Sequence, residues 1–222
     1  MSPDKIRLLA LTLVTMILSL SVHEFAHAWA ATRLGDDTPE RDERLTLSPL
    51  AHIDPIGTIL FPAISVLFGG FAFFGWAKPV QFNPNRFRRS VSVRGGSALV
   101  AAAGPLSNLL LAVLAMGFFV VLSRLGVIGH SPAGSTRDAL SVFLLAMFST
   151  NVGLCVFNFL PVPPLDGSYL LPRSLDDLVD RIRPFSLLLL MLLLSIPSIR
   201  QPLLDWPMGL LKSAILTLFG VG

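Results

Sequence analysis

The stretch LLALTLVTMILSLSVHEFAHAWAA, residues 8–31, decides the fold. It is an apolar run of the length that crosses a lipid bilayer as a helix, about 20 residues. Its second half nevertheless holds three ionisable side chains, those of His23, Glu24 and His27. Ionisable groups inside a membrane helix are unfavourable and generally mark function. These three residues are therefore the first candidates for a functional site.

The pattern His23-Glu24-Phe25-Ala26-His27 is suited to binding a metal. Residues four apart lie on one face of a helix, about 5–6 Å from each other, so both histidines can direct a ring nitrogen at one zinc ion. Glu24, next to the first histidine, can then act as general base toward a water molecule. The alternative is structural: two histidines hydrogen-bonded within a helix bundle, with Glu24 paired to an arginine.

The composition of the chain agrees with a membrane protein. Of its 222 residues, 53% are hydrophobic and 14% are charged, and the mean hydropathy is +0.70. Because an average soluble domain has about 25% charged residues, a soluble domain, a disordered chain and a nucleic-acid-binding arm are excluded. The net charge of +3 comes mainly from arginines between apolar runs, which is typical of cytoplasmic loops, so no nucleic-acid partner is expected.

Six apolar runs follow one another along the chain, and each is a candidate membrane segment. After residues 8–31 they cover residues 55–77, 95–125, 139–165, 185–199 and 203–219. The last run is interrupted by Asp205, Pro207 and Lys212, so it spans poorly or lies at the interface. The expected fold is an all-α polytopic membrane protein, a bundle of about five or six apolar segments.

A catalytic zinc site takes three protein ligands, so another run has to supply the third. The acidic candidates at run edges are Asp54, Asp138, Asp166 and Asp205. Asp166 stands out because it follows the sequence NFLPVPPL, residues 158–165, and precedes Gly167; prolines break a helix there and glycine permits an unusual turn. Broken backbone at membrane depth is tolerated where it lines protein or water. The alternative for Asp166 is an exposed residue at a helix end.

Together these motifs resemble those of the site-2 proteases, zinc metalloproteases that cut substrates within the membrane. The resemblance covers roughly residues 20–170 and rests on the H-E-x-x-H helix, on Gly104-Pro105-Leu106-Ser107-Asn108, and on Asn158-x-x-Pro161 leading to Leu165-Asp166-Gly167. It implies that His23, His27 and Asp166 bind one zinc ion per chain and that Glu24 is the catalytic base. It also implies a supporting or substrate-contacting role for Asn158, while Asn108 either orients substrate or hydrogen-bonds a neighbouring helix.

The larger site-2 proteases carry a PDZ domain or a nucleotide-binding module, and neither is recognisable in this sequence. A minimal, membrane-only member is therefore expected, with one membrane-embedded protease domain over residues 1–222. Its catalytic core would cover about 6–170 and its C-terminal accessory helices about 184–220.

The shared zinc site constrains the topology. The ends of runs 8–31 and 139–165 have to lie on the same side of a hydrocarbon core about 30 Å thick. If run 55–77 crossed the membrane, those two ends would lie on opposite sides. We therefore expect run 55–77 to be a re-entrant or interfacial excursion that turns at Gly69-Gly70.

The charges then orient the chain. The active-site side carries Arg33, Arg41, Arg44, Lys78, Arg86, Arg88, Arg89, Arg94, Arg173, Arg181 and Arg183, whereas the other side carries Lys5, Arg7, Arg124, Arg137 and Arg200. Excess Lys and Arg mark the cytoplasmic side. The expectation is a bacterial-type cytoplasmic membrane protein with its active site toward the cytoplasm and its N-terminus outside.

Residues 71–82 are rich in strand formers, and the resemblance implies a small β hairpin between the first helix and the Gly-Pro helix. Such a hairpin would pair with an unwound substrate and satisfy its freed backbone groups; the alternative is an ordinary apolar hairpin that packs on the bundle. His52 and Asp54 form either a structural pair near the interface or a second metal site or proton relay.

The expected function is zinc-dependent endoproteolysis of transmembrane proteins or peptides in the lipid bilayer. A catalytically silent metal-binding protein and a zinc transporter are the alternatives. A transporter would need ligands along a path, whereas these candidates cluster at one level. The sequence carries no signal for an oligomeric state.

Overall fold

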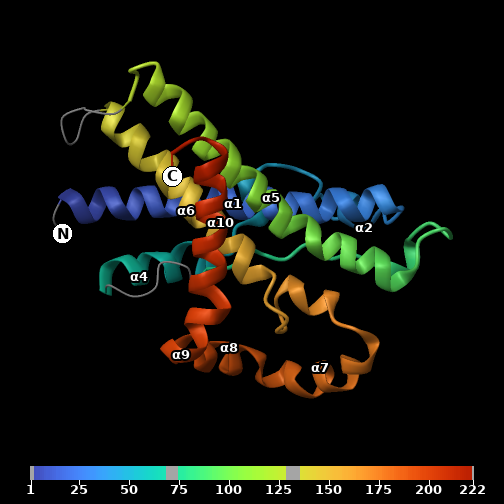
Figure 1. Cartoon of the computed structure of the whole chain (residues 1–222). Helices are drawn as coiled ribbons and strands as arrows, with labels where there is room; N and C mark the ends of the chain where they lie inside the picture. Colours follow the sequence, from blue (N-terminus) through green and yellow to red (C-terminus); the bar gives the residue numbers. More distant parts are fainter. Residues whose placement is uncertain (1–2, 69–74, 129–135, 222) are drawn as a thin grey trace.

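The computed structural model describes residues 3–68, 75–128 and 136–221. Three long helices dominate this part of the chain: α1 (Pro3–Leu34), α5 (Val93–Arg124) and α6 (Thr136–Asn158) (Figure 1). By length and composition each can cross a membrane, with mean hydropathies of 1.8, 2.3 and 2.0 for their spanning parts. The chain is therefore an integral membrane protein, and three of the expected spans are confirmed.

Shorter helical elements connect and flank these three. They are α2 (Thr38–Arg41), α3 (Pro49–His52), a π-helical turn Pro55–Leu60, α4 (Phe61–Phe68), a 3₁₀ turn Pro84–Arg86, 3₁₀ turns Asp166–Leu170 and Arg173–Leu175, α7 (Asp176–Ile182), a 3₁₀ turn Arg183–Phe185, α8 (Ser186–Ser195), α9 (Pro197–Arg200), a π-helical turn Gln201–Asp205 and α10 (Trp206–Leu218).

Helix α5 lies in the middle and packs against both α1 and α6. The largest buried cluster joins α5, α6 and α10 through Ala112, Ala115, Met116, Val120, Met147, Phe148, Val152 and Ile215. Small residues at such contacts let membrane helices approach closely. In Figure 1, α5 runs back against the direction of α1, and α6 then runs again in roughly the direction of α1.

The excursion between α1 and α5 returns to where it started. The Trp76 N–H donates to the Gly57 carbonyl at 3.2 Å, and the Lys78 N–H donates to the His52 carbonyl at 2.9 Å. The outgoing and returning chains are thus hydrogen-bonded to each other, and α4, of 8 residues, is too short to cross. These bonds agree with an excursion that is re-entrant or interfacial, although its place in the membrane stays a prediction; the predicted turn at Gly69-Gly70 lies outside the described residues.

The predicted β hairpin is wrong for the part of residues 71–82 that the structure describes, residues 75–82, which form no strand. Their backbone groups have other partners. The Val80 N–H donates to Glu24, the Lys78 and Pro79 carbonyls accept from Arg44, and the Trp76 carbonyl accepts from Thr58. Pro79 has no N–H with which to continue a ladder. Residues 75–82 therefore contain no strand that could form the predicted pairing with substrate.

His52 and Asp54 take structural roles at the base of the excursion. His52 is 1% exposed, and its Nε2 lies 2.8 Å from the Thr46 carbonyl. Asp54 caps the following π-helical turn by accepting from the Ile56 and Gly57 N–H groups. Within the described ranges neither residue belongs to a group of side chains that could hold a metal, which favours the structural alternative.

The C-terminal runs differ from the expected pair of separate segments. Helix α8 has 10 residues, about 15 Å, which is half of a hydrocarbon core. Residues Leu188–Ser195 and Pro197–Leu218 form a pair bent by 95°, which gives at most a fourth span. Pro197, Pro202 and Pro207 lie at or after the bend and lack the N–H that continues a helix. The described residues therefore offer three candidate spans, or four if the bent pair is one span. This agrees with the expectation that not all of the five or six apolar segments cross the membrane.

Candidate metal centre

Helix α1 places His23 and His27 one turn apart on one face, as their spacing predicts. Both are buried, with 4% and 8% exposure. Their rings stand edge to face with centroids 4.6 Å apart, and the two Nε2 atoms are 3.0 Å apart. Two ring nitrogens are therefore directed at one point inside the bundle.

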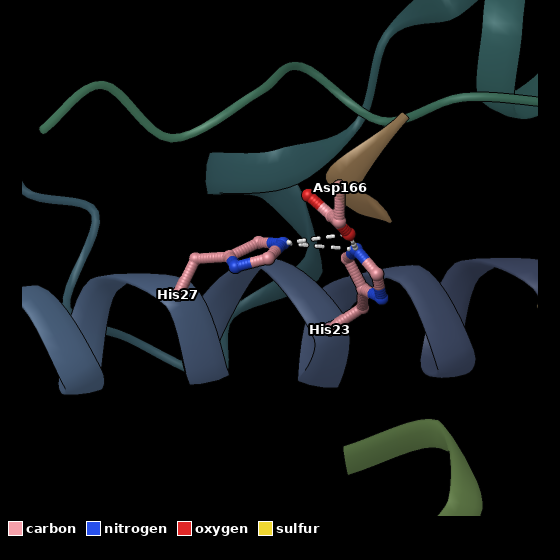
Figure 2. Close-up of side chains that lie close together, drawn as sticks. All are labelled: His23, His27 and Asp166. Atoms are coloured by element: carbon pink, nitrogen blue, oxygen red, sulfur yellow. Dashed lines mark hydrogen bonds and ion pairs between the residues drawn. The ribbon is translucent and has the colours of Figure 1, made fainter. Parts of the chain in front are cut away.

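Asp166 reaches the same point from a distant part of the chain (Figure 2). Its Oδ2 lies 3.2 Å from His23 Nε2 and 3.4 Å from His27 Nε2. Helix α6 ends at Asn158, and the Pro-rich turn that follows leads back to Asp166. Gly167 packs directly on the Phe159 and Leu160 carbonyls and leaves no room for a Cβ atom. The break in the helix thus serves to direct Asp166 toward the histidines, as the sequence motif predicts.

Gly104 of α5 provides space for the two imidazoles. A Cβ atom at this position would lie 2.6 Å from His23 Nε2 and closer still to His27 Nε2. Such distances are well inside van der Waals contact, so any larger residue would displace the rings. Gly104 therefore allows the two rings to pack directly against the backbone of α5.

The second nitrogen of each imidazole has a partner that orients the ring. His27 Nδ1 lies 2.7 Å from the Val100 carbonyl and His23 Nδ1 lies 2.7 Å from Asn108 Oδ1. Since both partners are acceptors, both Nδ1 atoms carry a proton, and in the neutral imidazole this leaves the lone pair on Nε2. Metal-binding histidines characteristically have such a partner on the other nitrogen.

Three electron-pair donors therefore face one another in this cluster: the Nε2 atoms of His23 and His27 and the Oδ2 atom of Asp166. Asp166 Oδ2 is buried without a hydrogen-bond donor, and it faces two unprotonated Nε2 atoms. Three donors at 3.0–3.4 Å repel one another unless a cation lies between them.

The separations also fit zinc. Ligand atoms bound at about 2.0–2.1 Å in tetrahedral geometry are about 3.3 Å apart, close to the 3.0, 3.2 and 3.4 Å observed. Two imidazoles and one carboxylate with a fourth position open form a donor set typical of catalytic zinc. In the described residues this is the group that could hold a metal ion.

Glu24 lies beside this cluster on the same helix. It is 8% exposed, and its Oε2 accepts from the Val80 N–H at 2.8 Å. Val80 belongs to the extended return of the excursion, residues 75–83, which we call the return segment. A buried carboxylate with one oxygen held by a backbone donor is fixed in orientation, as a general base has to be.

The two asparagines of the sequence motifs lie in different environments. Asn108 is fully buried and bonds to His23, to Asn151 and to the Ser19 carbonyl, so it hydrogen-bonds neighbouring helices. Asn158 is half-buried, and its Nδ2 donates to the Leu154 carbonyl of its own helix. Contact of either residue with substrate stays a prediction.

Three participants were not singled out from the sequence. The Val100 carbonyl orients His27, but a backbone group leaves no sequence signal. Arg44 is 7% exposed and binds the Lys78 and Pro79 carbonyls. Asn151 bonds Asn108 and Ser19 in the bundle. As a polar residue inside an apolar run, Asn151 carries the same signal that identified the others.

Comparison with known proteins places the chain among metalloproteases. The model of Peptidase family M50 matches residues 11–139. A Bacillus subtilis protein named "Putative zinc metalloprotease YwhC" is 40% identical over 166 residues, 75% of this chain and 68% of its own length. A Mycolicibacterium smegmatis protein named "Putative zinc metalloprotease Rip2" is 31% identical over 195 residues, 86% of this chain and 69% of its own length. No solved structure matches the chain.

Proposed function

The chain belongs to peptidase family M50, and we propose that it hydrolyses peptide bonds of transmembrane proteins with one zinc ion per chain. The observation that carries this proposal is the cluster of His23, His27 and Asp166, buried at the end of a membrane-spanning helix with three electron-pair donors facing one another. Such a cluster supports metal binding, and its place in a membrane helix supports a substrate that is itself in the membrane.

In this proposal the two histidines and Asp166 hold the metal ion. Zinc bound there supplies a Lewis acid that polarises the scissile carbonyl and activates a water molecule. The Val100 carbonyl and Asn108 keep the imidazoles in the tautomer that binds metal. The carboxylate compensates part of the charge of the cation in a site from which bulk water is largely excluded.

Glu24 is the proposed general base. It takes a proton from the attacking water and later delivers it to the leaving amine. The Val80 N–H anchors one oxygen of its carboxylate, which leaves the other available for the proton. Asn158 is the proposed donor to the substrate backbone or to the oxyanion, and its Nδ2 would then leave the Leu154 carbonyl.

We further propose that the site faces the cytoplasm. The loop after α1, residues 75–94 and the loop after α6 belong to one side, and they carry the larger share of Lys and Arg. That excess supports a cytoplasmic location for this side. The proposed unit is a single protease domain, with α8 to α10 as accessory helices that follow the catalytic core.

The test is cleavage of a membrane-spanning peptide by the purified full chain reconstituted in lipid, compared with Glu24→Gln. We expect Glu24→Gln to lose at least about 100-fold in rate while it keeps its zinc, because only the proton transfer is removed. Glu40→Gln, an exposed residue in the following loop, is the matched control and should cleave normally. Equal cleavage by wild type and Glu24→Gln would contradict the proposal, as would zinc flux without cleavage.

A further inference from the structure

Three polar side chains meet in the interior of the bundle, one from each long helix. Ser19 of α1, Asn108 of α5 and Asn151 of α6 are each 0% exposed. Ser19 lies one turn before His23 on α1. Fully buried amides are unfavourable unless every donor and acceptor has a partner. Their partners therefore show what the three side chains do.

The hydrogen bonds form one connected network. Asn151 Nδ2 donates to Ser19 Oγ and to the Met147 carbonyl, both at 2.8 Å. Asn151 Oδ1 accepts from Asn108 Nδ2 at 2.8 Å, and that nitrogen also lies 3.3 Å from the Ser19 carbonyl. Asn108 Oδ1 is left to face His23 Nδ1 at 2.7 Å. In both amides, therefore, the oxygen and the nitrogen each make at least one hydrogen bond.

A backbone carbonyl determines which atom of each amide donates a hydrogen bond and which atom accepts one. The Met147 carbonyl can only accept, so the nitrogen of the Asn151 amide has to face it and the oxygen has to face Asn108. Asn108 must then present its nitrogen to Asn151 and its oxygen to His23. An oxygen facing Nδ1 requires a proton on that nitrogen, which leaves the lone pair on Nε2 for a metal.

We propose that Asn151, acting through Asn108, is a positioning residue that selects the metal-binding tautomer of His23. The proposal rests on the proposed zinc site and extends it by one residue that touches none of the three ligands. Without the Asn151 oxygen, the Asn108 amide is held in this orientation only by the longer 3.3 Å contact with the Ser19 carbonyl, so it is freer to rotate by 180° and turn its nitrogen toward His23. His23 would then favour a proton on Nε2, the atom that faces Asp166 and His27.

A purely structural role for the same residues is the competing explanation, because buried asparagines also hold membrane helices together. The two roles differ in what they predict for zinc. Structural contacts affect the stability of the bundle whichever polar or packing residue is removed. Positioning affects zinc affinity only where the chain of hydrogen bonds to His23 is broken.

The first experiment measures the zinc dissociation constant of the full chain in detergent by competition with a chromophoric chelator. Asn151→Leu removes the amide with little change in volume, and it should weaken zinc binding about 10–100-fold, the range typical of partners of metal ligands. Two matched controls should stay within about twofold of wild type by the same reasoning. Thr15→Val removes a buried hydroxyl that has no hydrogen-bond partner, and Val152→Ala removes buried packing next to Asn151.

The second experiment tests the direction of the network at Asn108. Asn108→Asp keeps an acceptor for His23 Nδ1, and a carboxylate is a common partner of zinc-binding histidines. Asn108→Leu removes the acceptor. We expect Asn108→Asp to bind zinc at least about 10-fold more tightly than Asn108→Leu. The absorption spectrum of the cobalt(II)-loaded protein should change in Asn151→Leu and Asn108→Leu and remain as in wild type for Thr15→Val.

Three results would overturn the inference. Zinc binding by Asn151→Leu within twofold of wild type is the first. Equal weakening by Thr15→Val or Val152→Ala would show that the effect is only structural, and equal affinities of Asn108→Asp and Asn108→Leu would show that the acceptor is irrelevant. Failure of the wild-type protein itself to bind zinc would instead overturn the proposed function, and the inference with it.

Discussion

At the scale of single residues, the polar groups of the membrane helices are explained by specific partners. His23 bonds Asn108, His27 bonds the Val100 carbonyl, and Glu24 bonds the Val80 N–H. What remains unpaired at this point is Asp166 Oδ2 and the two Nε2 lone pairs, and all three face one another. Besides the three ligand residues, the most important residues are those that leave space for the two imidazole rings and the Asp166 carboxylate.

Gly104 is the clearest of these, because its missing side chain is what leaves space for the rings. Gly104→Ala should weaken zinc binding at least 10-fold and reduce cleavage accordingly, since the added Cβ would lie 2.6 Å from His23 Nε2. The same change favours helix formation by up to about 1 kcal/mol, so the fold should persist. Chelator competition and circular dichroism measure the two effects.

Gly117→Ala in the same helix is the matched control. Its Cβ would lie 3.1 Å from the edge of the Phe219 ring, close to the end of the chain and away from the histidines. Zinc affinity should therefore be unchanged. Undiminished zinc affinity of Gly104→Ala would show that the rings are not confined in the way described.

At the scale of elements, the return segment is held in place by two side chains of the loop after α1. Asp36, 0% exposed, accepts from the Asn83 N–H at 2.5 Å. Arg44 donates to the Lys78 and Pro79 carbonyls, the latter at 3.1 Å. Val80, directly after these carbonyls, donates to Glu24. These hydrogen bonds hold the return segment, which has no regular secondary structure, against Glu24, the proposed general base.

Arg44→Gln should therefore reduce cleavage while leaving zinc in place. A shorter side chain cannot bind both carbonyls, and leaving buried carbonyls unpaired costs about 1–3 kcal/mol each. The return segment should then shift away from Glu24, and cleavage should fall by at least about 10-fold if only one such bond is lost. Arg44 contacts none of the three ligands, so zinc content should stay as in wild type.

Arg41→Gln serves as the control for this change. Arg41 lies in the same loop but is exposed and pairs with Asp37 at the surface, where an ion pair contributes little. Cleavage by this variant should match wild type. Loss of zinc from Arg44→Gln would contradict the assigned role, because it would place Arg44 in the support of the metal cluster.

At the scale of the whole molecule, one constraint organises the chain: residues 23 and 166 have to meet. That requirement predicts a re-entrant or interfacial excursion, and the hydrogen bonds between its two ends support it. The helices α1, α5 and α6 alternate in direction (Figure 1), and the turn after α6 brings Asp166 to His23 and His27 of α1. The proposed orientation of this bundle in the membrane rests on the loop charges alone and is open to direct measurement.

Cysteine labelling in intact cells tests the orientation. The native Cys155 is buried, so introduced cysteines report without background. Leu125→Cys, at a position 70% exposed between α5 and α6, should react with a membrane-impermeant maleimide. Arg89→Cys, exposed on the active-site side, should react only after permeabilisation. The reverse pattern would place the metal centre outside the cell.

The sequence predicts the metal cluster better than its surroundings, and the reasons are physical. His23 and His27 follow from helical spacing, and Asp166 stands out among four acidic candidates because prolines break the helix before it and Gly167 follows it. The hairpin prediction failed because strand-forming residues express only a packing preference, whereas Arg44 and Glu24 decide where the backbone bonds go. The 95° bend after α8 depends on packing, although the prolines near it are visible in the sequence.

The central claim is that three side chains from distant parts of the chain bind one zinc ion, and the zinc content of the purified full chain tests it most directly. Elemental analysis of protein prepared with zinc should give about one ion per chain for wild type and a small fraction of that for Asp166→Ala. Asp138→Ala, which removes a carboxylate at the far end of the bundle, should retain the wild-type amount. Wild-type protein without zinc, or Asp166→Ala with a full complement of zinc, would contradict the account.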